Sequence, residues 1–265
     1  MTTVFKESGG RLELGAEVER ILTDGIGNAT GVVLRTSGRT HHADAVVCNA
    51  EVMNAPGIDS PPGARRKVRL HRPARLKSSM SLCVLYFGTT RRYPDKAHHE
   101  ILMGPRYQQL LADIFDRKVL ASDFSLYLHR PTATDPALAP PGCDAWYVLS
   151  PVPNLEGETD WKTAGPRYRD AILGYLEEHH LPDLSKHIVS ESMIDPRYFR
   201  DQLNARHGSA FSLVPVFTQS AWFRPHNRSH EVPNLYFCGA GTHPGAGVPG
   251  VISSGKIVAD LIGPA

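Results

Sequence analysis

The sequence lacks the features that define membrane-spanning, secreted or nucleic-acid-binding proteins. Its longest apolar run, Ser81–Phe87, is far shorter than the roughly 20 residues that a transmembrane helix requires. The first residues, Met1-Thr-Thr-Val-Phe, have neither the basic start nor the apolar core of a secretory signal peptide. The formal net charge is only +2, so charge gives no reason to expect nucleic-acid binding. We therefore expect a cytoplasmic protein.

Cysteine and histidine patterns argue against several kinds of site. The four cysteines form no C-x-x-C pair, and Cys48, Cys83 and Cys238 lie in apolar, strand-like runs. Such cysteines are usually buried free thiols, so we expect no disulfide. None of the 13 histidines has H-E-x-x-H spacing, so most are expected at the surface and no metal site is predicted. The sequence has no Walker A motif, and Val251–Gly255 lacks the first glycine of a nucleophile elbow.

Hydrophobic periodicity predicts a mixture of strands and helices. The predicted strands are Arg11–Leu14, Glu17–Leu22, Gly31–Thr36, Arg39–His42, Ala43–Cys48, Ser81–Phe87, Phe124–His129, Trp146–Ser150, His187–Ile194 and Asn234–Cys238. The predicted helices are Met1–Ser8, Gly104–Lys118, Asp160–His180, Asp195–Asp201 and Val248–Ile262. Most strand connections are not helical crossovers, so we expect an α/β or mixed α+β fold.

The most distinctive motif is Gly245-Ala-Gly-Val-Pro-Gly250, which has the pattern G-x-G-x-x-G. A Rossmann fingerprint needs a βαβ unit and an acidic residue about 20 positions later, and only 15 residues follow Gly250. The motif is therefore not interpreted as a Rossmann turn. Two interpretations stay open. The loop either serves only as a packed helix entry, or lets its backbone approach a ligand near the positive end of the helix.

The longer stretch Asn234–Gly255 resembles the C-terminal signature of bacterial carotenoid desaturases. These phytoene desaturases are FAD enzymes that remove hydrogen from a polyene hydrocarbon. The opening β-meander is similar to part of the FAD domain of the same superfamily. Two segments resemble the region that precedes this signature in the family: Ala205–Ser212 and Thr218–Asn227. Three more resemble the middle part of the family's sequences: Asp123–His129, Leu138–Gly142 and Tyr147–Pro153.

The resemblance implies a flavin site built by the C-terminal loop and helix. The start of the loop would approach the ribityl-phosphate region of FAD, and the helix entry would line the pyrimidine edge of the flavin ring. Val18 would contact the adenine through its backbone. His207, Trp222 and Arg224 lie in family-like segments and are candidates for catalytic residues. The residues implied to bind FAD are Val18, Gly239, Ala240, Gly241, Thr242, Gly247, Val248, Pro249, Gly250 and Val251.

The resemblance also implies how the chain is divided. Residues 1–50 and 204–265 would form part of a Rossmann-like FAD-binding domain, and residues 51–203 an inserted substrate domain of mixed sheet and helices. The family's N-terminal strand and G-x-G-x-x-G, which hold the ADP part of FAD, have no counterpart here, so we expect a truncated chain. Seven of the thirteen residues from Arg65 to Lys77 are basic, and Pro105–Phe115 is amphipathic. Both are candidates for peripheral contact with a membrane.

The expected activity is therefore FAD-dependent desaturation of phytoene toward lycopene. Two alternatives stay open. One is another enzyme of the flavin amine-oxidase type, such as a carotenoid isomerase or an amine oxidase. The other is a non-catalytic fragment.

Overall fold

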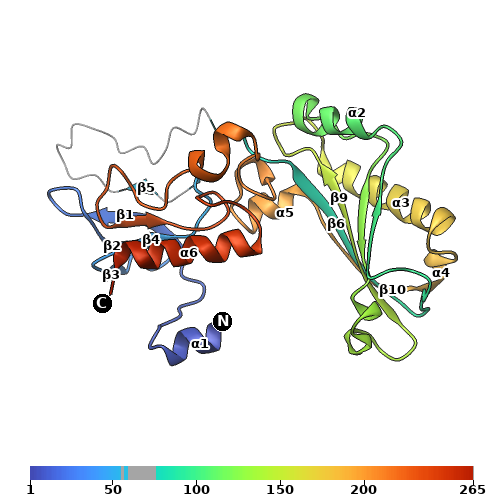
Figure 1. Cartoon of the computed structure of the whole chain (residues 1–265), viewed down its shortest axis with the longest axis horizontal. Coiled ribbons are helices and arrows are strands. Elements are labelled where there is room, and N and C mark those ends of the chain that lie inside the picture. The colour runs from blue at the N-terminus through green and yellow to red at the C-terminus, as the bar shows by residue number, and fades with distance from the viewer. Residues whose placement is uncertain (55–56, 59–75, 265) are drawn as a thin grey trace. The chain divides into compact units, whose positions relative to one another are not determined.

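The computed structural model describes residues 1–54, 57–58 and 76–264, and the chain forms two compact units (Figure 1). Unit 1 combines Met1–Arg75 with Phe217–Ala265, and unit 2 is Leu76–Val216. The sequence analysis placed its boundaries after residues 50 and 203, so both observed boundaries lie further along the chain. The assignment of cofactor and substrate roles to these segments stays a prediction.

Unit 1 contains a small sheet and a separate pair of parallel strands. The sheet has the strand order β3-β2-β1-β5. In the turn between β1 and β2, the Asp24 carboxylate accepts hydrogen bonds from the backbone amides of Ile26 and Asn28 at 3.0 and 2.8 Å. The elements of this unit are α1 (Thr2–Glu7), β1 (Val18–Thr23), β2 (Ala29–Leu34), β3 (Thr40–His42), β4 (Val46–Cys48), β5 (Gly57–Ile58), β11 (Leu235–Phe237) and α6 (Val248–Ile262).

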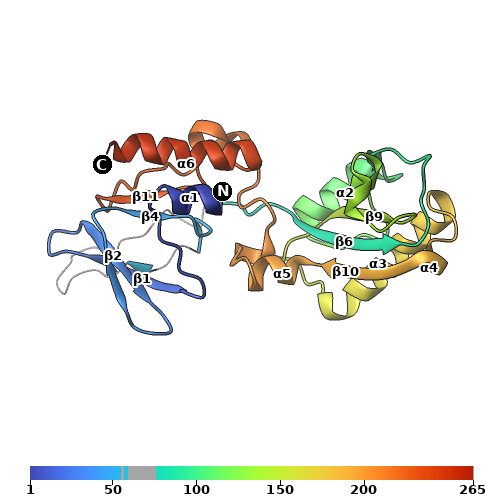
Figure 2. The same cartoon turned by 90° about the horizontal axis from the view of Figure 1, so that it is seen from below.

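The parallel pair β4–β11 positions the glycine loop. Val46 pairs with Leu235 and Cys48 with Phe237, so segments almost 190 residues apart in sequence lie side by side. Figures 1 and 2 show α6 running alongside this pair. The hydrophobic core of unit 1 includes buried side chains from its N-terminal and its C-terminal segment, among them Ile21, Val232 and Phe237. Because parallel strands end at the same edge, the residues after β4 meet the loop after β11.

Unit 2 is built on a five-stranded antiparallel sheet in the order β10-β6-β9-β8-β7. The long strand β9 alternates between buried and half-buried residues, as expected for a sheet with one covered face. On the covered face, Phe87 and Trp146 belong to the same buried cluster as Ile172 and Leu176 of α3 (Trp161–His179). The strands are β6 (Ser81–Thr89), β7 (His99–Leu102), β8 (Leu126–His129), β9 (Asp144–Val152) and β10 (Ile188–Ile194).

Two helices of unit 2, α3 (Trp161–His179) and α5 (Pro196–Asp201), begin at aspartate caps encoded in the sequence. The side chain of Asp160 accepts a hydrogen bond from the Lys162 amide, and Asp195 does the same for Arg197. Pro196 follows the second cap, where its missing N–H is not needed. The helices are α2 (Tyr107–Ala112), which continues as a π-helical turn (Asp113–Arg117), α3 (Trp161–His179), α4 (Leu184–His187) and α5 (Pro196–Asp201).

Two observations bear on the predicted membrane contact. No helix among the described residues is long and apolar enough to cross a membrane. Within the predicted amphipathic segment Pro105–Phe115, the side chains of Leu110 and Ile114 are buried, so they pack inside the protein. Most of the basic run 65–77 lies outside the described residues.

Candidate functional site

The loop between β11 and α6 depends on glycine for its backbone path. Gly239, Gly245 and Gly247 have φ angles of +113°, +137° and +96°. Residues with a Cβ rarely adopt these angles, so glycine is required at the start of the loop and again before the helix. The G-x-G-x-x-G pattern therefore encodes the turn into α6.

Gly250 is required for a different reason, which is close approach of two backbone segments. A Cβ at this position would lie 2.7 Å from the carbonyl oxygen of Gly245, closer than real contacts allow. The first turn of α6 thus packs directly on the loop that leads into it. A larger residue would push the helix start away from the loop.

Buried hydroxyl groups hold the start of the loop. Ser254 of α6 is fully buried, and its Oγ accepts a hydrogen bond from the Gly239 amide at 2.8 Å and donates to the Val251 carbonyl at 2.6 Å. Thr242, which is 1% exposed, donates from Oγ1 to the Gly239 carbonyl at 3.0 Å. These bonds hold the loop against the helix. The Gly239 amide and the Thr242 hydroxyl therefore already have hydrogen-bond partners within the protein.

Two polar side chains from the preceding segment hold the middle of the loop. Arg224 is 4% exposed and donates to the carbonyls of Ala240 and Gln219. Asn227 is equally buried, and its Nδ2 donates to the carbonyls of Phe237 and His243 at 3.1 and 2.9 Å. Burial lowers the pKa of the Arg224 guanidinium, although an arginine side chain stays a cation in proteins. The loop is therefore fixed in place by the protein itself.

The structure gives the three candidate catalytic residues different positions. Arg224 holds the loop and supports its backbone. Trp222 is 68% exposed and lies beside the His226 ring, with centroids 5.1 Å apart. His207 belongs to unit 2, where its Nε2 accepts a hydrogen bond from Arg206 at 3.1 Å and lies 3.8 Å from Glu156. Only Arg224 and Trp222 therefore share a unit with the glycine loop.

The N-terminus of α6 has free backbone N–H groups that can donate hydrogen bonds to a ligand. Its N-cap is Gly247, no side chain caps it, and its first turn contains no acidic residue. In the described part of the chain, the amides of Val248 and Gly250 have no hydrogen-bond acceptor, and Pro249 has no N–H. Val248 is 74% exposed and Gly250 is half-buried. The helix end therefore carries partial positive charge that a ligand oxygen or nitrogen can meet.

The other predicted cofactor residues lie at two further places. Among the described residues, the amides of Ala240 and Gly241 also have no partner, unlike those of Gly239 and Thr242. Val18 begins β1 and pairs with Leu34 across the first hairpin, in the same unit as the loop. Together with the helix end, the free amides of Ala240 and Gly241 leave a group of backbone donors that a polar ligand such as a flavin nucleotide could engage.

Sequence reasoning missed the residues that hold the loop from outside it. Asn49, directly after β4, donates from Nδ2 to the Cys238 carbonyl at 3.1 Å. Asn227 and Ser254 have the same supporting role. A signal existed for two of them, because Asn227 ends a family-like segment and Ser254 lies inside the signature. Asn49 directly follows the predicted strand Ala43–Cys48, and no motif in the sequence marks its role.

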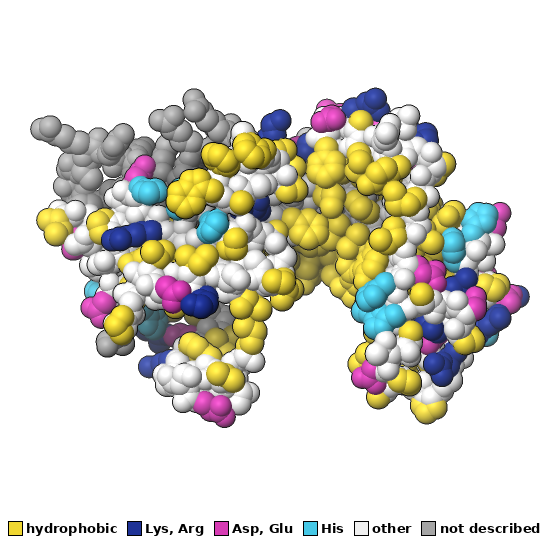
Figure 3. All heavy atoms as spheres, in the orientation of Figure 1, with side chains coloured by type: hydrophobic (Ala, Val, Ile, Leu, Met, Phe, Trp, Pro, Cys, Tyr) yellow, Lys and Arg dark blue, Asp and Glu magenta, His cyan; other side chains and the backbone are white. Residues whose placement is uncertain are grey.

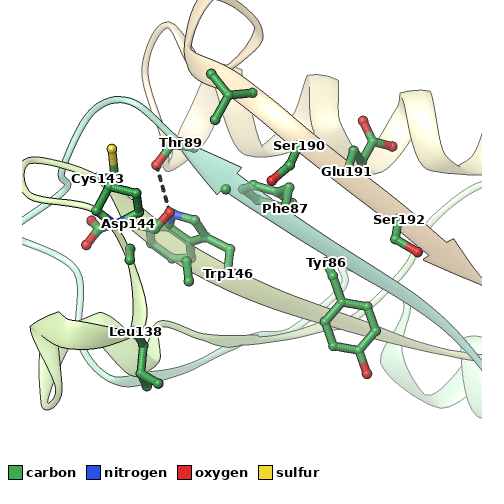
Figure 4. Close-up of a pocket in the computed structure, with 15 residues that line it drawn as sticks. Tyr86, Phe87, Thr89, Leu138, Cys143, Asp144, Trp146, Ser190, Glu191 and Ser192 are labelled. Atoms are coloured by element: carbon green, nitrogen blue, oxygen red, sulfur yellow. Dashed lines mark hydrogen bonds between the residues drawn. The ribbon is translucent and has the colours of Figure 1, made fainter.

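Unit 2 contains an apolar pocket, shown in Figure 4. Its volume is about 500 Å³, and its walls come from β6, β9, β10 and the 3-10 turn Pro136–Leu138. Its apolar lining residues include Tyr86, Leu138 and Trp146, and its polar ones include Thr89, Asp144 and Glu191. The pocket suits a hydrocarbon group better than a charged one.

Comparison with known proteins identifies the family. The family described as flavin-containing amine oxidoreductase matches residues 1–263. The chain is 47% identical over 266 aligned positions to a lycopene-forming phytoene desaturase of Pseudescherichia vulneris, covering 99% of this chain and 53% of the relative. It is 43% identical to a neurosporene-forming phytoene desaturase of Rhodobacter capsulatus, with 99% of this chain and 51% of the relative covered. The chain spans about half the length of the curated relatives it matches.

A solved structure supports the same assignment at the level of the fold. An oxidoreductase from Methanosarcina mazei superimposes with a TM-score of 0.62 at 19% identity, covering 97% of this chain and 51% of that protein. The mixed helix-and-sheet fold and the resemblance to phytoene desaturases are therefore confirmed. The chain belongs to the flavin-containing amine oxidoreductase family.

Proposed function

We propose that this chain supplies the flavin-ring and substrate portion of a FAD-dependent phytoene desaturase. The observation that carries the proposal is the uncapped N-terminus of α6, which follows a glycine loop fixed by Arg224, Asn227 and Ser254. The relatives with 47% and 43% identity are both phytoene desaturases, which supports the choice of substrate.

The chain's own residues would bind FAD at three places. Val248 and Gly250, with Val251 and Pro249 beside them, would hold the pyrimidine edge of the ring. The amides of Val248 and Gly250, together with the helix dipole, would stabilise negative charge there. Ala240 and Gly241 would meet the ribityl-phosphate region, and the backbone of Val18 the adenine. When bound, FAD supplies the acceptor for the hydride that leaves the polyene.

The substrate has no polar groups, so its binding must come from buried apolar area and shape. Burial contributes about 25 cal/mol per Å² of apolar surface, which makes an apolar pocket an effective site for part of a long polyene. The pocket beside Leu138 and Trp146 offers such a surface in unit 2. We propose that one end of the substrate occupies it.

Flavin binding and phytoene conversion test this proposal separately. FAD should bind to the purified chain and lose fluorescence, and Gly250→Ala should weaken this binding at least about tenfold. For conversion, the chain is joined to the part of the Pseudescherichia vulneris enzyme that it does not cover, and the chimera is expressed in phytoene-producing cells. Coloured carotenoids are expected. A folded chimera that binds FAD and leaves phytoene unchanged would contradict the proposed substrate.

We also propose that the basic run 65–77 brings the protein to an anionic membrane, where the substrate is dissolved. Each basic residue near such a surface contributes about 1 kcal/mol of attraction. Replacing its seven Arg and Lys residues with Gln should greatly reduce sedimentation with anionic vesicles. Equal sedimentation of both proteins would remove this assignment.

A further inference from the structure

Three histidines of unit 2 lie together, although the sequence pattern predicted no metal site. His98 directly precedes β7, His99 begins it, and His129 ends β8, where it pairs with His99. One ligand nitrogen from each ring lies within 4.8 Å of the other two. Figure 3 shows histidine side chains gathered at the surface of this part of unit 2. Strand pairing, rather than sequence spacing, creates the cluster.

Two of the rings meet through like atoms. The Nε2 atoms of His98 and His129 are 2.8 Å apart, in rings only 6° from parallel. An imidazole nitrogen is either a donor or an acceptor, so this contact requires one proton between the two rings. A bound cation can replace that proton, because both lone pairs then interact with the same positive charge.

Hydroxyl groups occupy the second nitrogens of two rings. Nδ1 of His98 is hydrogen-bonded to Thr134 Oγ1, and Nδ1 of His99 lies 2.7 Å from the Tyr127 hydroxyl oxygen. Metal-binding histidines usually engage their second nitrogen in this way, which fixes the ring and its tautomer. The arrangement thus includes the three rings and outer partners, which are the hydroxyl groups of Thr134 and Tyr127.

A buried ion pair holds the backbone that carries the cluster. Arg130, directly after His129, donates to the carbonyls of Tyr93 and Lys96, each at 2.6 Å. Its guanidinium also pairs with Asp144, which is fully buried, at 3.3 Å. The Arg130 amide donates to the His98 carbonyl at 2.9 Å. The two histidine-bearing segments are therefore fixed to each other, as a preorganised site requires.

We propose that His98, His99 and His129 bind one divalent first-row transition metal ion such as Zn²⁺, with a fourth position open to water. Imidazole is a preferred ligand of these ions. Zn–N bonds of about 2.0–2.1 Å in tetrahedral geometry place ligand nitrogens about 3.3 Å apart. The observed spacings, from 2.8 Å to no more than 4.8 Å, bracket this value. His99 is exposed, so its ring can rotate into position without disturbing the core.

The test is metal titration of the tag-free chain. Zn²⁺ binding is measured by calorimetry, and Co²⁺ binding by the visible d–d absorption of a tetrahedral complex. One equivalent of each ion should bind. His129→Gln and His99→Gln should each weaken binding at least about tenfold. Tyr127→Phe keeps all three ligands and should weaken binding by up to about tenfold through loss of the outer partner.

The matched control is His179→Gln with His180→Gln, since these residues also form an adjacent histidine pair in unit 2. This control should bind metal like the original chain. Circular dichroism of each variant checks that the fold is retained. Because His99 is exposed, His99→Gln is the variant that should disturb the fold least. No saturable binding, or equal binding after all three histidines are replaced, would overturn the proposal. Binding abolished only by blocking the cysteines would overturn it as well.

Discussion

Arg224 donates two hydrogen bonds to the carbonyl oxygen of Ala240, from Nε at 2.9 Å and from Nη2 at 2.8 Å. The guanidinium is buried, so these bonds form away from water. Arg224→Met should lower the free energy of unfolding by about 2–4 kcal/mol, because the Ala240 and Gln219 carbonyls would lose a charged donor. Urea denaturation measures this change, and FAD titration should show weaker binding in the same variant.

A surface arginine provides the control for this prediction. Arg35 is paired with Glu17 at 3.3 Å, but both side chains are at least 60% exposed. Arg35→Gln should change the free energy of unfolding by less than about 1 kcal/mol. Equal losses for the two variants would show that Arg224 does not hold the loop.

Gly250 and Gly255 of α6 form a matched pair for testing close approach. Gly250→Ala should destabilise the protein by about 1–3 kcal/mol, because its Cβ would contact the Gly245 carbonyl oxygen. Gly255 is exposed, and a Cβ there meets no atom within 4 Å. Gly255→Ala should therefore stabilise the helix by up to about 1 kcal/mol. Thermal unfolding of both variants checks the prediction, and shifts of the same sign would contradict it.

The fold was most predictable for the long helices, where apolar residues recur at helical spacing. The structure confirms α6 at Val248–Ile262 and places α3 at Trp161–His179, one residue inside the predicted range at each end. The strand predicted at Arg11–Leu14 is wrong, because that segment has no regular structure and Leu14 is 83% exposed. Its alternating pattern has no core to pack against. β7 was missed since it is short, with two exposed residues, and forms only through pairing with β8.

The glycines of the candidate site could be predicted from the sequence, whereas the residues that hydrogen-bond to the glycine loop from other segments could not. The φ angles of Gly239, Gly245 and Gly247, from +96° to +137°, are rare for residues with a Cβ, so the motif marks the loop in the sequence. Asn49 and Arg224 reach the loop from other segments, and their contacts depend on the β4–β11 pairing. The histidine cluster was missed for the same reason, because His129 lies 31 residues from His98.

Ser254 and Ser253 test whether the loop is fastened to the helix. Ser254→Ala removes the acceptor of the Gly239 amide, which is then buried without a partner, and should cost about 1–3 kcal/mol of stability. Ser253 is exposed, so Ser253→Ala should change stability by less than about 0.5 kcal/mol. Hydrogen exchange of the Gly239 amide should accelerate only in the Ser254 variant. Unchanged exchange would mean that Ser254 does not protect this amide.

Cys83 should be the least reactive thiol of the protein. It is fully buried on β6, and burial, with a smaller contribution from the charge of Asp195, raises the pKa of its thiol to about 12. At pH 8, iodoacetamide should modify the half-buried Cys143 and Cys238 in the folded chain and reach Cys83 only after unfolding. Mass spectrometry of the alkylated peptides measures this order. Rapid modification of Cys83 in the folded protein would contradict its burial.

The same pKa shift makes stability depend on pH in a defined direction. In the unfolded chain the Cys83 thiol titrates near 9.0, whereas in the folded chain it stays protonated up to about pH 12. Between these values only the unfolded state loses the proton, so stability falls as pH rises through this window. The loss should reach about 1 kcal/mol at pH 10. Urea unfolding at pH 8 and pH 10 measures it, and Cys83→Ala should be less sensitive to the change by that amount. Equal sensitivity of both proteins would show that the thiol does not titrate differently in the two states.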